Sequence, residues 1–159
     1  MPRKHGVRFW FLIALLGITT MLGYLSQHFF AFIVISGESM EPTLKSGETI
    51  WIRKDCTDYY VGDVVVADIV EDDDMIRIVK RIIARYPATI SISNSAILVD
   101  GKEVIDIAYY PMTLNTNFTF EMSPDQYFLF GDNSKISDYH FVVKEQIVGR
   151  KLLTPNYEQ

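Results

Sequence analysis

The hydrophobic positions of the chain follow two patterns. Near the start, Phe9–Leu25 is a run of 17 residues without a charged side chain, which is at the short end of the length that crosses a bilayer as a helix. A second apolar run, Phe29–Ile35, extends the apolar surface after a short break. Beyond it, apolar and polar residues alternate in short segments, the pattern of half-buried strands. We therefore expect one N-terminal transmembrane helix followed by a mainly β domain.

The strand pattern recurs along the rest of the chain. Asp100-Gly101 lies between two such segments and predicts a hairpin turn. Short strands at close spacing favour a compact antiparallel β-barrel or sandwich. The acidic run Glu71–Asp74 falls between two segments, where a solvated hairpin tip explains it better than a metal site, so we expect no metal. The predicted strands are 49–53, 64–70, 75–85, 89–93, 96–99, 103–107, 117–122, 126–130 and 146–153.

The charges are distributed unevenly between the two parts. Residues 1–26 carry Arg3, Lys4 and Arg8 and no acid, whereas the rest carries 12 basic and 20 acidic residues, a net charge of −8. Basic residues before a membrane helix predict a cytoplasmic N-terminus, so the β domain is expected on the other side. An acidic domain argues against nucleic acid as a partner.

These patterns predict a basic tail over residues 1–8, a membrane anchor over 9–26 and an extracytoplasmic domain over 27–159. A cleaved secretory signal is the alternative for the first segment. The apolar run is longer than usual for such a signal, and no small-x-small site follows it before Ser39. We therefore favour an uncleaved anchor that contacts the lipid bilayer.

The turn-like segment Ser36–Leu44 interrupts the apolar pattern with Gly, Ser and Pro. Gly37 permits a tight turn, and Pro42 keeps the residues before it out of regular helix. A serine in such a turn, Ser39, can be presented to a substrate carbonyl, as a nucleophile requires. An ordinary surface loop has the same composition, so the segment alone leaves both interpretations open.

A lysine with unusual neighbours lies in the strand predicted over 75–85. Because side chains alternate between the faces of a strand, Lys80 shares a face with isoleucines, whereas three arginines share the other face and are expected to reach water. Apolar surroundings disfavour the ammonium form and lower the pKa, which makes a lysine a general base. The alternative is a side chain that extends outward to solvent. The two faces are Ile76, Ile78, Lys80, Ile82 and Ala84, and Arg77, Val79, Arg81, Ile83 and Arg85.

Four segments, in order, resemble the motifs of the bacterial type I signal peptidases, in the form typical of Gram-positive bacteria. They are Gly37–Leu44 (Gly-x-Ser-Met-x-Pro-Thr-Leu), Val61–Val66, Val79–Ile83 and Gly131–Ser137. The resemblance extends over roughly residues 8 to 150. It implies a membrane-anchored serine endopeptidase that removes N-terminal signal peptides from membrane-bound preproteins after small-x-small sites. It also implies a location in the bacterial cell membrane and no cofactor.

The resemblance assigns roles to individual residues. It places the nucleophile on Ser39 and the general base on Lys80, with the Ser39 N–H as the oxyanion donor. Gly37 stands where some relatives carry an additional serine donor. Ser137 matches a serine that orients the lysine, and Arg81 with Asp132 is expected to pair in support. Gly131 and Asn133 belong to the same supporting motif.

A substrate pocket is also implied by the resemblance. It would bind small side chains of an extended precursor between edge strands. Plain core packing is the alternative for Leu44 and Val79. The pocket residues carried over are Ile33, Ile35, Met40, Leu44, Ile78 and Val79. The domain is expected to consist of a core over 30–85 and 126–153 with a small inserted β region at about 86–125.

The chain departs from the family pattern after Ser137. The family usually continues with x-Asp-Ser-Arg, whereas this chain has Asp138-Tyr139-His140-Phe141. Three alternatives stay open, the first two of them because of this departure. One is a triad of Ser39, His140 and Asp138. Another is a signal-peptidase-like assembly or binding factor with weak or narrow activity, such as for a surface-fibre subunit. The third, a self-cleaving Ser/Lys repressor relative, would need DNA-binding helices where the apolar anchor lies.

Overall fold

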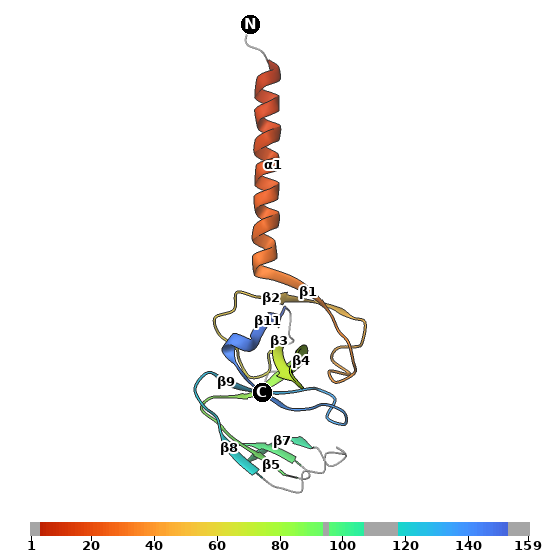
Figure 1. The fold of residues 1–159 in the computed structure, drawn as a ribbon, viewed down its shortest axis with the longest axis vertical. Helices are drawn as coiled ribbons and strands as arrows, with labels where there is room; N and C mark the ends of the chain where they lie inside the picture. Colours follow the sequence, from red (N-terminus) through yellow and green to blue (C-terminus); the bar gives the residue numbers. More distant parts are fainter. Residues whose placement is uncertain (1–3, 94–95, 107–117, 153–159) are drawn as a thin grey trace.

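The protein begins with one long helix that stands away from the rest of the chain (Figure 1). The structure, a computed structural model, describes residues 4–93, 96–106 and 118–152. Helix α1 spans Lys4–Phe29 and so extends beyond the predicted anchor at both ends. Its segment Arg8–Phe29, 22 residues long, is long and apolar enough to cross a membrane, and none of it is buried against the domain. The helix leads without a linker into β1 (Phe30–Val34).

The strands form two antiparallel sheets. Seven strands pair in the order β1-β2-β11-β3-β4-β9-β10, and four in the order β7-β6-β5-β8. In the described part of the chain, no pairing joins the edge strands β1 and β10 of the first sheet or β7 and β8 of the second. Both sheets are therefore open, and neither forms the barrel that was one of the two expected architectures. The first sheet contains β2 (Thr49–Arg53), β3 (Val64–Glu71), β4 (Asp74–Arg85), β9 (Gln126–Phe130), β10 (His140–Val143) and β11 (Ile147–Lys151). The second contains β5 (Thr89–Ile92), β6 (Ala96–Val99), β7 (Lys102–Asp106) and β8 (Phe118–Glu121).

The second sheet is inserted between β4 and β9 and lies at the end of the domain farthest from α1 (Figure 1). All nine predicted strands have a counterpart in the structure. The other two strands are β1, which lies in the apolar run Phe29–Ile35 outside the predicted strands, and β10. Strand β10 was not predicted, because its four residues, His140–Val143, follow a polar loop and lack a clear alternation. A short 3₁₀ helix, η1 (Lys144–Gln146), separates it from β11.

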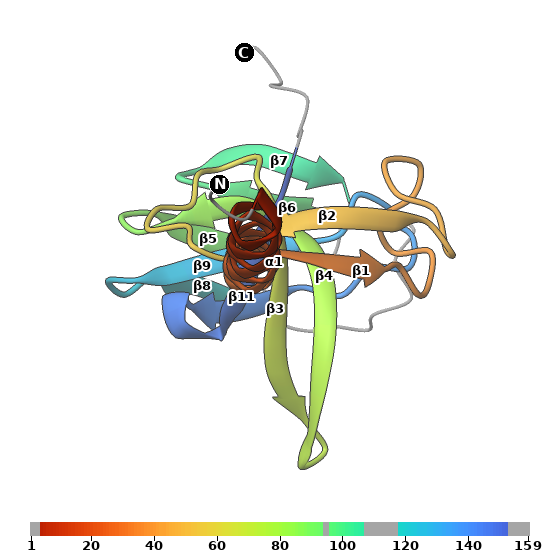
Figure 2. The same ribbon diagram turned by 90° about the horizontal axis from the view of Figure 1, so that it is seen from above.

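Strands β3 and β4 form a long hairpin that projects from the domain (Figure 2). Its pairing runs without a break from Val64 opposite Arg81 to Glu71 opposite Asp74. The turn residues Asp72 and Asp73 have φ of 49° and 68°, a left-handed conformation that aspartate tolerates. The acidic run therefore forms the tip of this hairpin.

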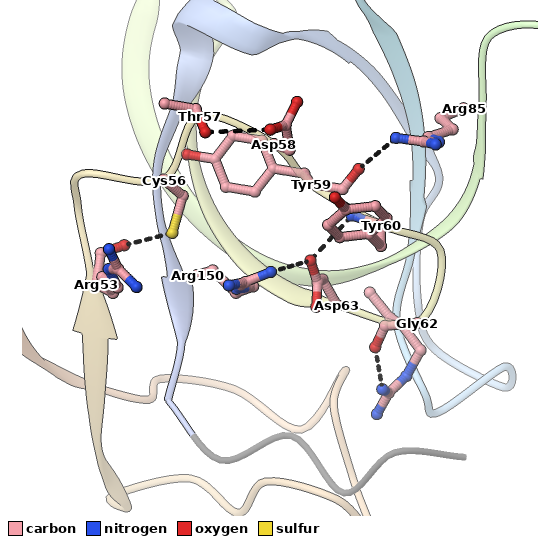
Figure 3. Close-up of polar contacts among 11 residues, drawn as sticks. Arg53, Cys56, Thr57, Asp58, Tyr59, Tyr60, Gly62, Asp63, Arg85 and Arg150 are labelled. Carbon is pink, nitrogen blue, oxygen red and sulfur yellow. Dashed lines mark hydrogen bonds and ion pairs between the residues drawn. The ribbon is translucent and has the colours of Figure 1, made fainter. Parts of the chain in front are cut away.

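A cluster of polar contacts fixes the start of β3 (Figure 3). The Gly62 carbonyl accepts a hydrogen bond from Arg81 Nη1 at 2.7 Å. The Asp63 carboxylate accepts one from the Tyr60 N–H at 2.9 Å and one from Arg150 Nη1 at 3.0 Å. Gly62 has a φ of 95°, which favours glycine. The motif Val61–Val66 thus joins β3 to β4 and β11 and has a structural role.

Candidate active site

A pocket of about 370 Å³ lies where the end of β1 faces the first half of β4. The residues that follow β1, from Ser36 to Met40, form one wall, and the segment before β10 closes one side. Met40 and Leu44 anchor the turn because their side chains are almost completely buried in the core below it. The lining includes Ile33, Ile35, Gly37, Ser39, Met40, Ile78, Val79, Lys80, Asp138 and His140.

Lys80 is buried at the inner side of this pocket, with only 5% of its surface exposed. Its Nζ donates a hydrogen bond of 2.8 Å to Ser137 Oγ. Burial lowers the pKa of the Lys80 amine below its ordinary value, and the nearby Asp138 carboxylate partly opposes this shift. The predicted burial of Lys80 is confirmed, and the alternative of an outward lysine is excluded.

Ser137 is completely buried and its hydroxyl has several partners. Besides the Lys80 amine, its Oγ accepts a hydrogen bond from the Gly131 N–H at 2.8 Å and donates one to the Asp138 carbonyl at 3.2 Å. A Cβ at position 131 would collide with Ser137 Oγ and with the Ser39 carbonyl oxygen. Only glycine therefore allows this close approach between the two loops.

The turn that carries Ser39 is hydrogen-bonded to the loop of residues 131–137, which also contains Gly131 and Ser137. The Ser39 carbonyl accepts a hydrogen bond from the Asn133 N–H at 3.0 Å, and the Glu38 carbonyl accepts one from Asn133 Nδ2 at 3.2 Å. Ser39 is half-buried and lines the same pocket as Lys80. Gly37 has a φ of 93°, so the turn uses a conformation that favours glycine. The loop of residues 131–137 thus contacts both the backbone of the Ser39 turn and the Lys80 amine.

Arg81 connects β4 to the loop of residues 131–137. Its guanidinium makes two hydrogen bonds to the Asp132 carboxylate, at 2.7 and 2.6 Å, and the pair is largely buried. The expected Arg81–Asp132 pair is therefore present. The expectation that Arg81 reaches water with its neighbours on the same face is wrong. Arg77 and Arg85 are exposed, but Arg81 lies where β9 begins to pair with β4 and is covered there.

Five of the six residues expected in the substrate pocket line it. Leu44 does not, because it is completely buried among core residues beneath the turn, which is the alternative stated for it above. Sequence reasoning missed Ile76 and Ile136. The pocket lies along the edge of β4 and is lined by consecutive residues of this strand. The alternation of strand faces therefore does not predict which residues of β4 line the pocket. Other lining residues without a prior prediction are Val34, Ser36, Glu71 and Arg77.

The residues that depart from the family pattern also face this pocket. Asp138 and His140 both line it, together with Ser39. Burial, and then the positive charge of Lys80, lower the pKa of the His140 imidazole, whereas Asp138 and Glu71 act in the opposite direction. The pocket therefore holds every side chain of the Ser/Lys dyad and of the alternative triad.

Comparison with known proteins identifies the family. A serine turn and a buried lysine on an antiparallel sheet are typical of a Ser/Lys hydrolase. The chain matches the signal peptidase family, peptidase S26, over residues 7–154. It is 30% identical over 131 residues to signal peptidase I of Bacillus amyloliquefaciens, and this match covers 73% of this chain and 66% of that protein. It is 32% identical over 134 residues to signal peptidase I S of Bacillus subtilis, and this match covers 76% of this chain and 71% of that protein.

The chain therefore belongs to the signal peptidase family, peptidase S26. Because this is a family of peptidases, the expected enzyme class is confirmed at the level of the family. The chain spans 66% of the length of the first of these relatives. The more distant signal peptidase I U of Bacillus subtilis is 25% identical over 146 residues.

Proposed function

We propose that the chain is a membrane-anchored serine endopeptidase that removes N-terminal signal peptides from secreted precursors after small-x-small sites. The observation that carries the proposal is the position of Lys80. It is buried, its pKa is lowered, and it opens onto the same pocket as the Ser39 turn. Membership of the signal peptidase family supports the same reaction.

The proposed mechanism is that of a Ser/Lys dyad. Neutral Lys80 accepts the proton of the Ser39 hydroxyl, and Ser39 Oγ attacks the scissile carbonyl carbon. The Ser39 N–H stabilises the oxyanion of the tetrahedral intermediate. The intermediate collapses with cleavage of the C–N bond, and protonated Lys80 gives its proton to the leaving amine. Water then hydrolyses the acyl-enzyme. Ser137 holds the lysine, and Arg81, Gly131, Asp132 and Asn133 hold the loops.

The free strand edges support an extended peptide as substrate. β1 is an edge strand, and β9 pairs with β4 only from Arg81 onward. Among the described strands, the segment Asp74–Lys80 therefore has β3 on one side and a free edge on the other. A peptide between the two edges would gain main-chain hydrogen bonds, and the side chains of the pocket would select small residues. These side chains are Ile33, Ile35, Met40, Ile78 and Val79.

The helix and the charges support the proposed location. α1 would cross the bilayer, with the basic N-terminal residues on the cytoplasmic side. The acidic domain over residues 27–159, with the inserted region about 86–125, would then lie outside the membrane. Its partners would be membrane-bound preproteins and lipid, and no nucleic acid.

One experiment tests both the activity and the mechanism. The full chain in proteoliposomes is mixed with a precursor that has an Ala-x-Ala site, and cleavage is compared with that of Ser39→Ala, Lys80→Ala and His140→Ala. Loss of cleavage in the first two variants, with activity retained in His140→Ala, is the expected result. Activity that survives Lys80→Ala but not His140→Ala would establish the triad instead. A folded protein that cleaves no precursor would support the binding-factor alternative, which family membership does not favour.

A further inference from the structure

We infer that the inserted second sheet positions Lys80 for the proposed reaction, by holding the loop that contacts this lysine through five packed aromatic rings. The inference rests on the proposed function, in which Lys80 is the general base. The five rings, which we call the aromatic cluster, come from both sheets. They are Phe118 and Phe120 of β8, Phe128 of β9, and Tyr139 and Phe141 at the start of β10.

Two of these rings stand where the chain departs from the family pattern. That pattern has x-Asp-Ser-Arg after the serine that matches Ser137, whereas this chain has Asp138-Tyr139-His140-Phe141. Tyr139 and Phe141 therefore replace an acidic and a basic residue. Aromatic rings stabilise a fold when apolar neighbours cover them, so this replacement requires a partner surface that a charged pair does not need.

The side chains of this segment alternate between the pocket and the second sheet. Asp138 and His140 line the pocket. Tyr139 and Phe141 instead pack against the core cluster to which both sheets contribute. Because successive side chains of an extended segment point to opposite sides, contacts of the two rings also limit the movement of the pocket-lining residues beside them.

Ring contacts connect the segment directly to β8 and β9. The centroid of the Phe141 ring lies 4.7 Å from that of Phe120 and 5.0 Å from that of Phe128. The Tyr139 centroid lies 6.0 Å from that of Phe128 and 6.3 Å from that of Phe118. These separations are typical of aromatic pairs that attract each other. Phe128 is completely buried and contacts both rings of the segment, so it fixes them to β9.

The aromatic cluster lies at both ends of the loop of residues 131–137. β9 leads directly into Gly131, and Tyr139 follows Ser137 by two positions. The Ser137 Oγ accepts hydrogen bonds of 2.8 Å from the Lys80 amine and from the Gly131 N–H. A change in the packing of the cluster would therefore move the acceptor of the Lys80 amine.

This arrangement gives the second sheet a role in the site without a place in the pocket. The sheet lies at the end of the domain farthest from α1, and none of its described residues lines the pocket (Figure 1). Its edge strand β8 pairs with β5 and contacts the segment before β10 through Phe118 and Phe120. Loosening these contacts should therefore affect the chemical step more than the binding of substrate.

The Phe120→Ala variant of the full chain tests the inference, because Phe120 is half-buried and is not among the residues that line the pocket. In cleavage of an Ala-x-Ala precursor, we expect kcat to fall by about tenfold with an unchanged KM, since the base is displaced and the lining is kept. Phe120→Tyr keeps the ring and should retain the original kcat.

Ile97→Ala is the matched control for stability. Ile97 is completely buried in the same core cluster, but it belongs to β6, which β5 separates from β8. At a temperature where all variants are folded, it should keep the original kcat although its melting temperature falls at least as far as that of Phe120→Ala. An equal loss of kcat in both variants, or an unchanged kcat in Phe120→Ala, would overturn the inference.

A double-mutant cycle tests whether the effect passes through Ser137. In the Ser137→Ala background the Lys80 amine has already lost this acceptor, so Phe120→Ala should cause little further loss of kcat. Two losses that multiply in the double variant would show that the aromatic cluster does not act through Ser137, and would contradict the inference.

Amide hydrogen exchange tests the support of the loop without a substrate. The Gly131 N–H is bonded to Ser137 Oγ and the Asn133 N–H to the Ser39 carbonyl, so both should exchange slowly in the intact chain. Loss of an aromatic pair in Phe120→Ala should speed both exchanges by up to about tenfold, whereas Ile97→Ala should not.

The exchange and the cleavage distinguish the two proposals. If the intact chain cleaves the precursor but exchange of Gly131 and Asn133 does not respond to Phe120→Ala, the inference fails and the proposed function stands. If exchange responds as expected but the folded chain cleaves no precursor, the proposed function fails, and the second sheet still holds the loop.

Discussion

Lys80 Nζ and Ser137 Oγ lie 2.8 Å apart, and both side chains are buried. The two residues are 57 positions apart in the sequence, so the position of the lysine depends on the loop before β10 as well as on β4. The same oxygen accepts a hydrogen bond from the Gly131 N–H. The amine of the proposed base is thus held by a group that also fixes the loop that contacts the Ser39 turn.

We expect Ser137→Ala to reduce both activity and stability. The change leaves the Lys80 amine and the Gly131 N–H without their shared acceptor, and an unsatisfied buried donor costs about 1–3 kcal/mol. A displaced base would lower kcat by about tenfold to a hundredfold. Urea unfolding and steady-state cleavage measure the two effects. Ser134→Ala in the same loop is the matched control, and a similar loss in that variant would contradict the role given to Ser137.

Gly131→Ala should be as damaging as the loss of Ser137, for a steric reason. The new Cβ would collide with Ser137 Oγ and the Ser39 carbonyl, so the two loops must separate. Such overpacking costs about 1–3 kcal/mol and would move the Ser39 turn away from the loop that holds Lys80. Cleavage assays and thermal unfolding measure the effect. Gly17→Ala, where the added methyl meets no atom within 4 Å, should leave activity unchanged. Full activity in Gly131→Ala would show that this close approach is not required.

Two arginine–aspartate pairs of β4, Arg81–Asp132 and Arg77–Asp68, should differ in their contribution to stability. The Arg81–Asp132 side chains are 11% and 14% exposed, whereas those of Arg77 and Asp68 are 50% and 27% exposed. Breaking a buried pair leaves an uncompensated charge, so Asp132→Asn should lower the free energy of unfolding by about 3 kcal/mol. Asp68→Asn should lower it by less than about 1 kcal/mol. Equal effects in denaturant titrations would contradict the structural role of Asp132.

Much of the fold could be predicted because the strands keep a clear alternation. The hairpin at Asp100-Gly101 and the acidic tip at Asp72 and Asp73 follow from local turn chemistry, and the structure contains both turns. Closure of the sheet depends instead on which distant strands pair, and this is not encoded in local periodicity. The prediction of antiparallel strands is therefore confirmed, whereas its barrel alternative is not, and β10 was missed because four residues carry too little pattern.

The candidate site could likewise be predicted only in part from the local sequence pattern. Alternation along β4 placed Lys80 among isoleucines but left an outward side chain open, and the family resemblance favoured the buried base that the structure contains. The same alternation placed Arg81 in water because the Asp132 carboxylate that covers it comes from a distant loop. Leu44 and Met40 have similar sequence environments, and only the packing of the turn separates the core residue from the lining residue. The contacts of Asn133 with Glu38 and Ser39 join segments far apart in sequence and need the structure.

The pH dependence of cleavage should report the charge of Asp138. The proposed Ser/Lys mechanism requires neutral Lys80, so kcat/KM should rise as the pH rises through the pKa of this amine, which burial holds below its ordinary value. The Asp138 carboxylate favours the ammonium form and raises this pKa. Asp138→Asn should therefore lower the pKa further and move the acid limb of the profile to lower pH. Glu71→Gln is the matched control, because Glu71 also lines the pocket but does not contribute to the shift of Lys80. An acid limb that stays in place in Asp138→Asn, or moves to higher pH, would show that Lys80 is not the titrating base.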